Sequence, residues 1–186
     1  MFPSPAVRAG PIWWAMFLVA WPACSGEHGK PATAQHVGER LTLEHPADWT
    51  VVSQQGRNEG LFMGIYEVLG PASARIFITI YDAQAPFAAE DVAAMHLNAL
   101  PDALAGRPVT ETHRAAVTAE VGGQSVRGLS VQFTVPFEGR PLPHTVRAFT
   151  WKTDRRTAAV VTQLADQDAA QEQAGVNLVL RSLTVR

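Results

Sequence analysis

Apolar and polar residues alternate along most of the chain beyond residue 40, and this spacing of two predicts β-strands. The clearest case is the segment 75–81, where isoleucines occupy every second position. The residues between them are also largely apolar, since they include Phe77 and Tyr81. A strand that is apolar on both faces is typical of the centre of a sheet with a layer on each side.

The same alternation predicts other strands on both sides of this one. They are expected at 41–44, 49–52, 61–68, 109–119, 124–135, 145–151 and 158–164. The pair Gly122-Gly123 predicts a two-residue hairpin turn. The polar stretch Gln54–Asn58 is expected to be a turn, and the proline-rich stretch Pro136–Pro143 an irregular connection.

Two segments instead repeat their apolar positions every three or four residues, which predicts helices. The first spans residues 88–104 and begins with acidic residues, which suit the positive end of the helix dipole. The second closes the chain, and Asp166 or Asp168 is expected to cap it. Its apolar stripe consists of Val176, Val179, Leu180 and Leu183. Strand meanders with one inserted and one closing helix predict an α+β fold, an antiparallel sheet with helices packed on it.

The first 23 residues follow a third pattern. Residues 12–21 form an uninterrupted apolar run, and Arg8 is the only charged side chain before it. This run is too short for a helix that crosses a bilayer, which needs about 20 residues. A charged start, an apolar run of about ten residues and small residues after it predict a secretory signal.

The apolar run ends in Trp21-Pro22-Ala23-Cys24, which resembles a bacterial lipobox. In such a sequence the cysteine is acylated and becomes the first residue of the mature protein. We therefore expect a lipoprotein signal peptide at 1–23, a lipid anchor on Cys24 and a flexible tether at 24–36. Two alternatives stay open: ordinary cleavage after Ser25, which discards the cysteine, or an uncleaved anchor.

Composition adds exclusions to this picture. The chain has 186 residues, 47% of them hydrophobic and 17% charged, which is too apolar for a disordered protein. Its net charge is −2 and its isoelectric point is near 6.3. A general nucleic-acid binder needs a basic face, so no nucleic-acid partner is expected. The single cysteine excludes a disulfide framework.

The order of the predicted elements resembles the PsbP-like superfamily, and in particular the DcrB-type envelope lipoproteins of bacteria. The resemblance covers residues 37–186 and rests on structural motifs. These are an early strand that ends in Pro46 and Trp49, the isoleucine-rich strand before the first helix, the glycine hairpin and the closing helix that ends in Leu183. The resemblance implies a three-layer α/β/α sandwich with a central, mainly antiparallel sheet and two main helices. It implies no single activity, because members of the superfamily mostly bind or assemble with other proteins.

Candidate chemistry is sparse. The sequence has no glycine-rich phosphate loop, HExxH helix, paired CxxC or GxSxG elbow, so we expect no enzyme, no cofactor and no metal site. His96 lies on the apolar face of the first predicted helix, where a histidine is more often a satisfied core residue than a ligand. A groove beside His96 is the candidate site for the alternative function, a periplasmic carrier of a small ligand or metal. His28 and His36 are expected in solvent near the tether, and His45 in a turn.

Four residues are candidates for partner binding. Phe137 and Arg140 lie in the proline-rich connection, and aromatic and arginine side chains are enriched in interface hot spots. Arg155 and Arg156 form a basic pair in a tight turn. Together with the export signal, they lead us to expect a membrane-tethered envelope lipoprotein that binds an envelope protein without catalysis. Ser25 after the cysteine favours the periplasmic face of the outer membrane.

Overall fold

The computed structural model describes residues 32–186 except 59–60, 83, 85, 105 and 154. Residues 31–186 form one compact unit. The predicted signal peptide, the lipidation site Cys24, His28 and most of the predicted tether lie outside the described residues, so those predictions stay predictions. In the described part of the chain, no helix is long and apolar enough to span a membrane.

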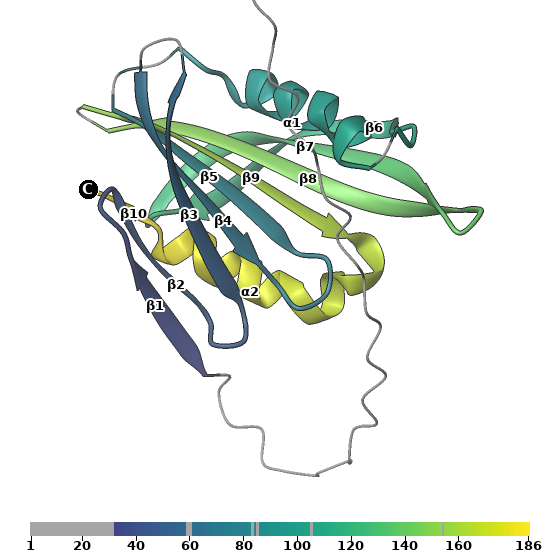
Figure 1. Cartoon of the computed structure of the whole chain (residues 1–186), viewed down its shortest axis with the longest axis horizontal. Helices are drawn as coiled ribbons and strands as arrows, with labels where there is room; N and C mark the ends of the chain where they lie inside the picture. Colours follow the sequence, from purple (N-terminus) through teal and green to yellow (C-terminus); the bar gives the residue numbers. More distant parts are fainter. Residues whose placement is uncertain (1–31, 59–60, 83, 85, 105, 154) are drawn as a thin grey trace, which may run out of the picture. The chain divides into compact units, whose positions relative to one another are not determined.

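A seven-stranded sheet with the order β3-β4-β5-β9-β8-β7-β6 forms the centre of the fold (Figure 1). All neighbouring strands in it are antiparallel. The strands are β3 (Thr50–Asn58), β4 (Leu61–Leu69), β5 (Arg75–Tyr81), β6 (Thr110–Val121), β7 (Gln124–Phe137), β8 (Arg140–Lys152) and β9 (Thr157–Ala165). The isoleucine-rich strand β5 lies inside the sheet, as its two apolar faces predict.

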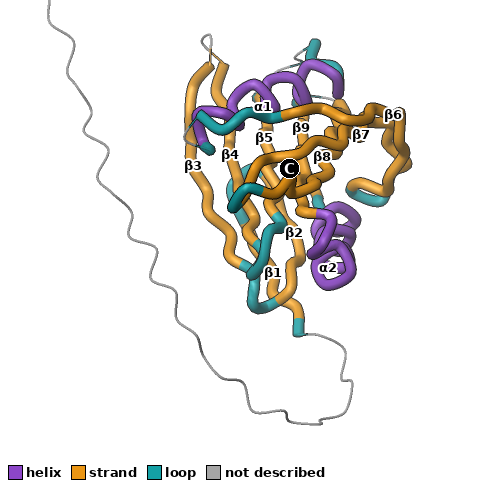
Figure 2. The backbone as a smooth tube through the Cα atoms, turned by 90° about the vertical axis from the view of Figure 1, so that its right-hand side faces the viewer, coloured by secondary structure: helices purple, strands orange, loops and turns teal. Residues whose placement is uncertain are grey.

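One helix packs on each face of this sheet (Figures 1 and 2). The helix α1 (Ala89–Ala103) covers β7, β8 and β9, where its Ala93 and Leu100 meet Val131 and Phe133. The helix α2 (Ala169–Ser182) follows the short 3-10 helix η1 (Asp166–Asp168) and packs on the opposite face, against the isoleucines of β5. These layers confirm the predicted α+β sandwich with a mainly antiparallel sheet and two main helices.

A second, small sheet lies on the α2 side and was not predicted in full. It has the order β1-β2-β10, formed by β1 (Thr33–Val37), β2 (Leu41–Pro46) and β10 (Thr184–Val185). The backbone oxygen of Ala32 accepts a hydrogen bond of 2.9 Å from the nitrogen of Ala47. The part of the expected tether at residues 33–36 therefore belongs to β1.

Three predicted turns belong to strands instead. Gln54–Asn58 continues β3 in register with β4, because an edge strand tolerates polar residues. His45 is 8% exposed and lies on β2. The proline-rich stretch 136–143 forms the outer ends of β7 and β8, joined by Glu138 and Gly139 with φ of 49° and 76°.

The prolines are tolerated there because this β7–β8 hairpin extends beyond its neighbours. Pairing between β7 and β8 continues to Phe137 and Arg140, whereas the pairing of β8 with β9 stops at His144 and Ala165. The outer edges of the hairpin therefore have no adjacent strand that needs the missing N–H groups.

The expected cap of α2 is right in position but makes no side-chain bond. Asp168 is at the N-cap of α2 without a side-chain capping bond, and Asp166 accepts a hydrogen bond of 2.8 Å from the hydroxyl of Thr145 on β8. By contrast, Asp91 in the first turn of α1 accepts the backbone N–H of Ala88 at 2.9 Å, as an acidic helix start favours.

Candidate functional site

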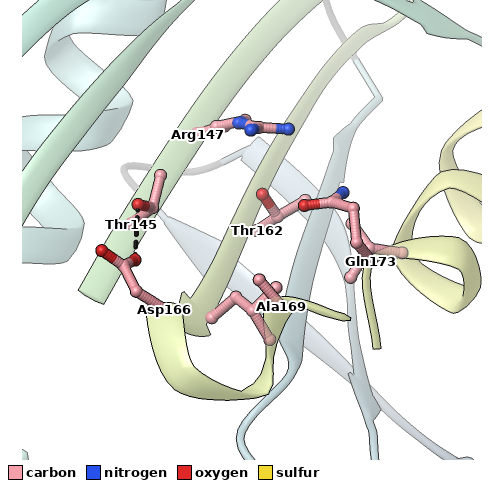
Figure 3. Close-up of a pocket in the computed structure, with 8 residues that line it drawn as sticks. Thr145, Arg147, Thr162, Asp166, Ala169 and Gln173 are labelled. Atoms are coloured by element: carbon pink, nitrogen blue, oxygen red, sulfur yellow. Dashed lines mark hydrogen bonds between the residues drawn. The ribbon is translucent and has the colours of Figure 1, made fainter. Parts of the chain in front are cut away.

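A concave polar surface runs along α2, between this helix and the strands β6 to β9. At its centre, Thr145 and Arg147 of β8 and Thr162 of β9 face the first turns of α2, which contribute Ala169 and Gln173 (Figure 3). These residues line a cavity of about 70 Å³. We call this cavity the Arg147 pocket.

The polar row across the strands arises where the apolar core of the α2 face ends. Arg147 pairs in register with Ser130 of β7 and Thr162 of β9, and Thr162 pairs with Ile76 of β5. Ile76 is fully buried in the core under α2. Alternation also places Arg147 on the same face as Phe149, which is fully buried. Arg147 is therefore a charged residue on a strand face that is otherwise apolar, at the place where this face reaches solvent.

Arg147 and Thr162 both have unused hydrogen-bonding capacity. Arg147 is half-buried, and within the part of the chain that the structure describes its guanidinium has no hydrogen-bond or ion-pair partner. Thr162 is only 4% exposed, and its hydroxyl likewise bonds to no described residue. In Figure 3 this hydroxyl points into the space below Arg147. Both polar groups face the pocket and are free to bond, so a ligand that enters it can supply their partner.

The other polar side chains of the pocket are engaged. The hydroxyl of Thr145 donates to Asp166, and the side-chain nitrogen of Gln173 donates to the side-chain oxygen of Asn177 at 3.0 Å. These bonds engage Thr145 and one N–H of Gln173, while Arg147, Thr162 and the second N–H of Gln173 remain available as donors.

A further hollow lies near each end of the pocket, and we call the three together the α2 groove. Beyond η1, Gln167 and the β7–β8 hairpin line a hollow of about 520 Å³. At the other end, Arg147 also lines a hollow of about 290 Å³ with Asn177 and Arg181 of α2 and Glu120 of β6. The α2 groove therefore suits an extended chain better than a compact molecule.

The structure brings together two of the four predicted partner-binding residues. Phe137 and Arg140 are opposite each other at the tip of the β7–β8 hairpin and both line the larger hollow. Phe137 is 50% exposed, and the guanidinium of Arg107 lies 6.0 Å from the centre of its ring. Both predicted residues thus belong to one end of the α2 groove.

The other two lie elsewhere. Arg155 and Arg156 are in the turn after β8, at the opposite end of this 13-residue strand from Arg140. Arg156 forms an ion pair with Asp82 at 3.1 Å, while Arg155 lines a hollow with Arg186. They therefore do not join the α2 groove.

His96 is part of the packing between α1 and the sheet. Its Nε2 lies 2.8 Å from the side-chain oxygen of Gln163 on β9, and its ring is 5.0 Å from that of Phe77. Burial lowers the pKa of His96 below its usual value, although the bond to Gln163 acts in the opposite direction. This environment favours a neutral imidazole held between helix and sheet.

The pKa of His96 makes stability depend on pH. As the pH falls below about 6.5, the unfolded chain takes up a proton before the folded one does, so the free energy of unfolding decreases. We expect His96→Gln to weaken this decrease. Urea midpoints at pH 7.5 and 5.5 measure it, and an equal decrease in both proteins would contradict the prediction.

His36 corrects a second expectation, because it is not in solvent. It lies on β1 at 5.9 Å from the ring of Tyr66, and its Nε2 is buried without a partner among the described residues. Burial, and to a lesser extent His45, lower the pKa of His36. Across the described ranges, no three histidine, cysteine, aspartate or glutamate side chains come together as metal ligands do.

Neither Arg147 nor Thr162 was predicted as a site residue from the sequence. A signal was present for Arg147, since it shares a strand face with Phe149 and Trp151, both apolar. A charged side chain on the buried face of a strand indicates either an ion-pair or hydrogen-bond partner within the fold or a binding site. No comparable signal exists for Thr162, because threonine is common in strands.

Comparisons with known proteins concern the fold. The sequence matches no model of a protein family and no curated protein. The solution structure of cyanobacterial PsbP from Synechocystis sp. PCC 6803 is similar, with a TM-score of 0.50 and 13% identity over 88% of this chain and 98% of that one. LpqN of Mycobacterium tuberculosis, described as involved in cell envelope biogenesis, gives a TM-score of 0.44 and 12% identity over 83% and 90%. The chain thus has a PsbP-like fold, as the resemblance of its sequence implied.

Proposed function

We propose that this protein is a membrane-tethered envelope lipoprotein of the DcrB type, which binds a partner protein in the α2 groove without catalysing a reaction. The observation that carries the proposal is the pair of unpartnered polar groups, Arg147 and Thr162, in the central pocket of the α2 groove. The exposed ring of Phe137 at one end of that groove adds an aromatic contact of the kind enriched in interfaces.

The tether supports the same proposal. The lipobox-like sequence ending in Cys24 predicts an anchor in the envelope, and the predicted tether after it leads to the domain. A short tether holds the domain near the membrane and raises its effective concentration for partners there. The likeness to cyanobacterial PsbP supports the fold of such a module.

Photo-crosslinking in cells tests the binding function. A photoreactive benzophenone amino acid replaces Asn177, an exposed residue of α2 that lines the groove. The control has it at Met95, which is 54% exposed on α1. We expect a discrete crosslinked protein from position 177 and none from 95. Equal labelling at both positions, or a small molecule that co-purifies in place of a protein, would refute the proposal.

Mass spectrometry of the mature protein tests the anchor. The expected first residue is Cys24 carrying acyl chains, and Cys24→Ala is expected to move the protein out of the membrane fraction. An unlipidated protein that begins at Ser25 or Gly26 would show that ordinary cleavage occurs instead.

A further inference from the structure

We propose that the Arg147 pocket receives the carboxylate of an aspartate or glutamate side chain of the partner protein. The inference rests on the protein-binding function proposed above, and it specifies which chemical group of the partner enters the groove and what holds it there.

The guanidinium of Arg147 is the first reason. It reaches from β8 across β9, above Thr162 (Figure 3), and is unpaired among the residues that the structure describes. A guanidinium presents its N–H groups in a planar fork that matches the two oxygens of a carboxylate. Its half-buried position strengthens such a pair relative to one in open solvent.

The hydroxyl of Thr162 is a second and independent reason. This hydroxyl bonds to no described residue and lines the cavity. It can donate to an oxygen that lies beneath Arg147. The donors of Arg147 and Thr162, which pair across neighbouring strands, therefore line the same cavity.

The size of the pocket limits what it accepts. Its volume of about 70 Å³ is far below the roughly 300–1,000 Å³ of pockets that hold drug-sized molecules. It therefore holds a carboxyl group but not an entire drug-sized ligand. Because the hollows at both ends are larger, the chain that carries the carboxylate can extend along α2 in both directions.

The charges around the pocket set the direction of approach. Asp166 is the acidic group on the rim, and its bond from Thr145 engages it on the η1 side. On the other side, Arg181 lines the adjoining hollow together with Glu120. Each side thus has one carboxylate, and the two arginines, Arg147 and Arg181, favour the entry of a carboxylate on the side away from Asp166.

Peptide selection tests the assignment. Random heptapeptides displayed on phage are selected on the purified full-length protein, and the winners are measured against Arg147→Gln. We expect an acidic residue at one fixed position, and about ten-fold weaker binding to the variant, as for the loss of one charge-assisted bond. Arg147→Glu is expected to select a basic residue at that position.

The matched control is Arg127→Gln, which removes an exposed arginine from the opposite face of β7. It should leave the binding of the selected peptides unchanged. Urea midpoints confirm that each variant is folded, and Arg147→Lys, which keeps the charge but not the fork, should bind at an intermediate level.

Three results would overturn the inference. The first is that no peptide is selected. The second is that binding stays the same when the acidic residue of the peptide is replaced by its amide. The third is that inorganic phosphate displaces the peptide at a lower concentration than acetate does, which would indicate a phosphate site. The proposed function fails separately. If a partner is crosslinked at position 177 and Arg147→Gln does not reduce its capture, the protein-binding function stands and the carboxylate site is refuted. If acidic peptides are selected but no cellular partner is crosslinked, the carboxylate site stands and the protein-binding function is refuted.

Discussion

Replacing Glu172 with alanine is expected to lower the free energy of unfolding by about 3–5 kcal/mol. Glu172 is in the first turn of α2 and is only 2% exposed. Its carboxylate accepts the backbone N–H groups of Ala72, Ser73 and Ala74 at 3.0, 2.8 and 2.7 Å. The substitution leaves these donors of the β4–β5 loop without an acceptor, and a buried unsatisfied donor costs about 1–3 kcal/mol.

Urea unfolding followed by tryptophan fluorescence measures this loss. Glu172→Gln, which keeps one acceptor oxygen but loses the charge, should fall between the wild type and the alanine variant. The matched control is the neighbouring Gln171→Ala, an exposed position on the same helix that should change stability by less than about 0.5 kcal/mol. Similar losses at 171 and 172 would show that the effect belongs to the helix and not to the carboxylate.

Glu172 also shows where periodicity is informative and where it stops. The apolar stripe of the last helix was predicted, and Val176 and Leu180 are buried as it requires. Continued back by four residues, the stripe reaches Glu172, but a carboxylate on a buried helix face has no assigned partner in sequence alone. The backbone N–H groups that donate to this carboxylate lie about a hundred residues earlier in the chain, and only the fold brings them together.

The candidate site has the same limit. Phe137 and Arg140 were predicted from residue type, and they do belong to the α2 groove. The predicted irregular connection around them is a hairpin, since a strand that extends beyond its neighbours tolerates prolines. Arg147 and Thr162 form a pocket only because β8 and β9 pair in a register that puts them side by side. Register and the position of α2 determine the pocket, and neither follows from local pattern.

Replacing Asp82 with asparagine is expected to lower the free energy of unfolding by about 2 kcal/mol. The side chain of Arg40, just before β2, is 11% exposed and donates to both carboxylate oxygens of Asp82, from Nε at 3.0 Å and from Nη2 at 2.7 Å. Arg156 of the β8–β9 turn joins the same carboxylate. Breaking a buried ion pair costs about 3–5 kcal/mol, and the expected loss is smaller because the Asp82 side chain is 29% exposed.

The pH dependence identifies the ion pair as the cause. Hydrogen bonds from Arg40 hold the pKa of Asp82 below its usual value, since they favour the ionised form. The pair therefore stabilises the folded state fully above about pH 4, the unfolded value, and this contribution is lost as the pH falls through the folded pKa. Asp82→Asn should weaken this loss of stability at acid pH.

Glu39→Gln is the matched control, because Glu39 contacts the same Arg40 at 3.2 Å but has a side chain that is 67% exposed. Exposed ion pairs contribute little to stability, so Glu39→Gln should cost less than Asp82→Asn. An equal loss of stability in both variants would show that net charge near Arg40, and not its ion pair with Asp82, stabilises this end of the fold.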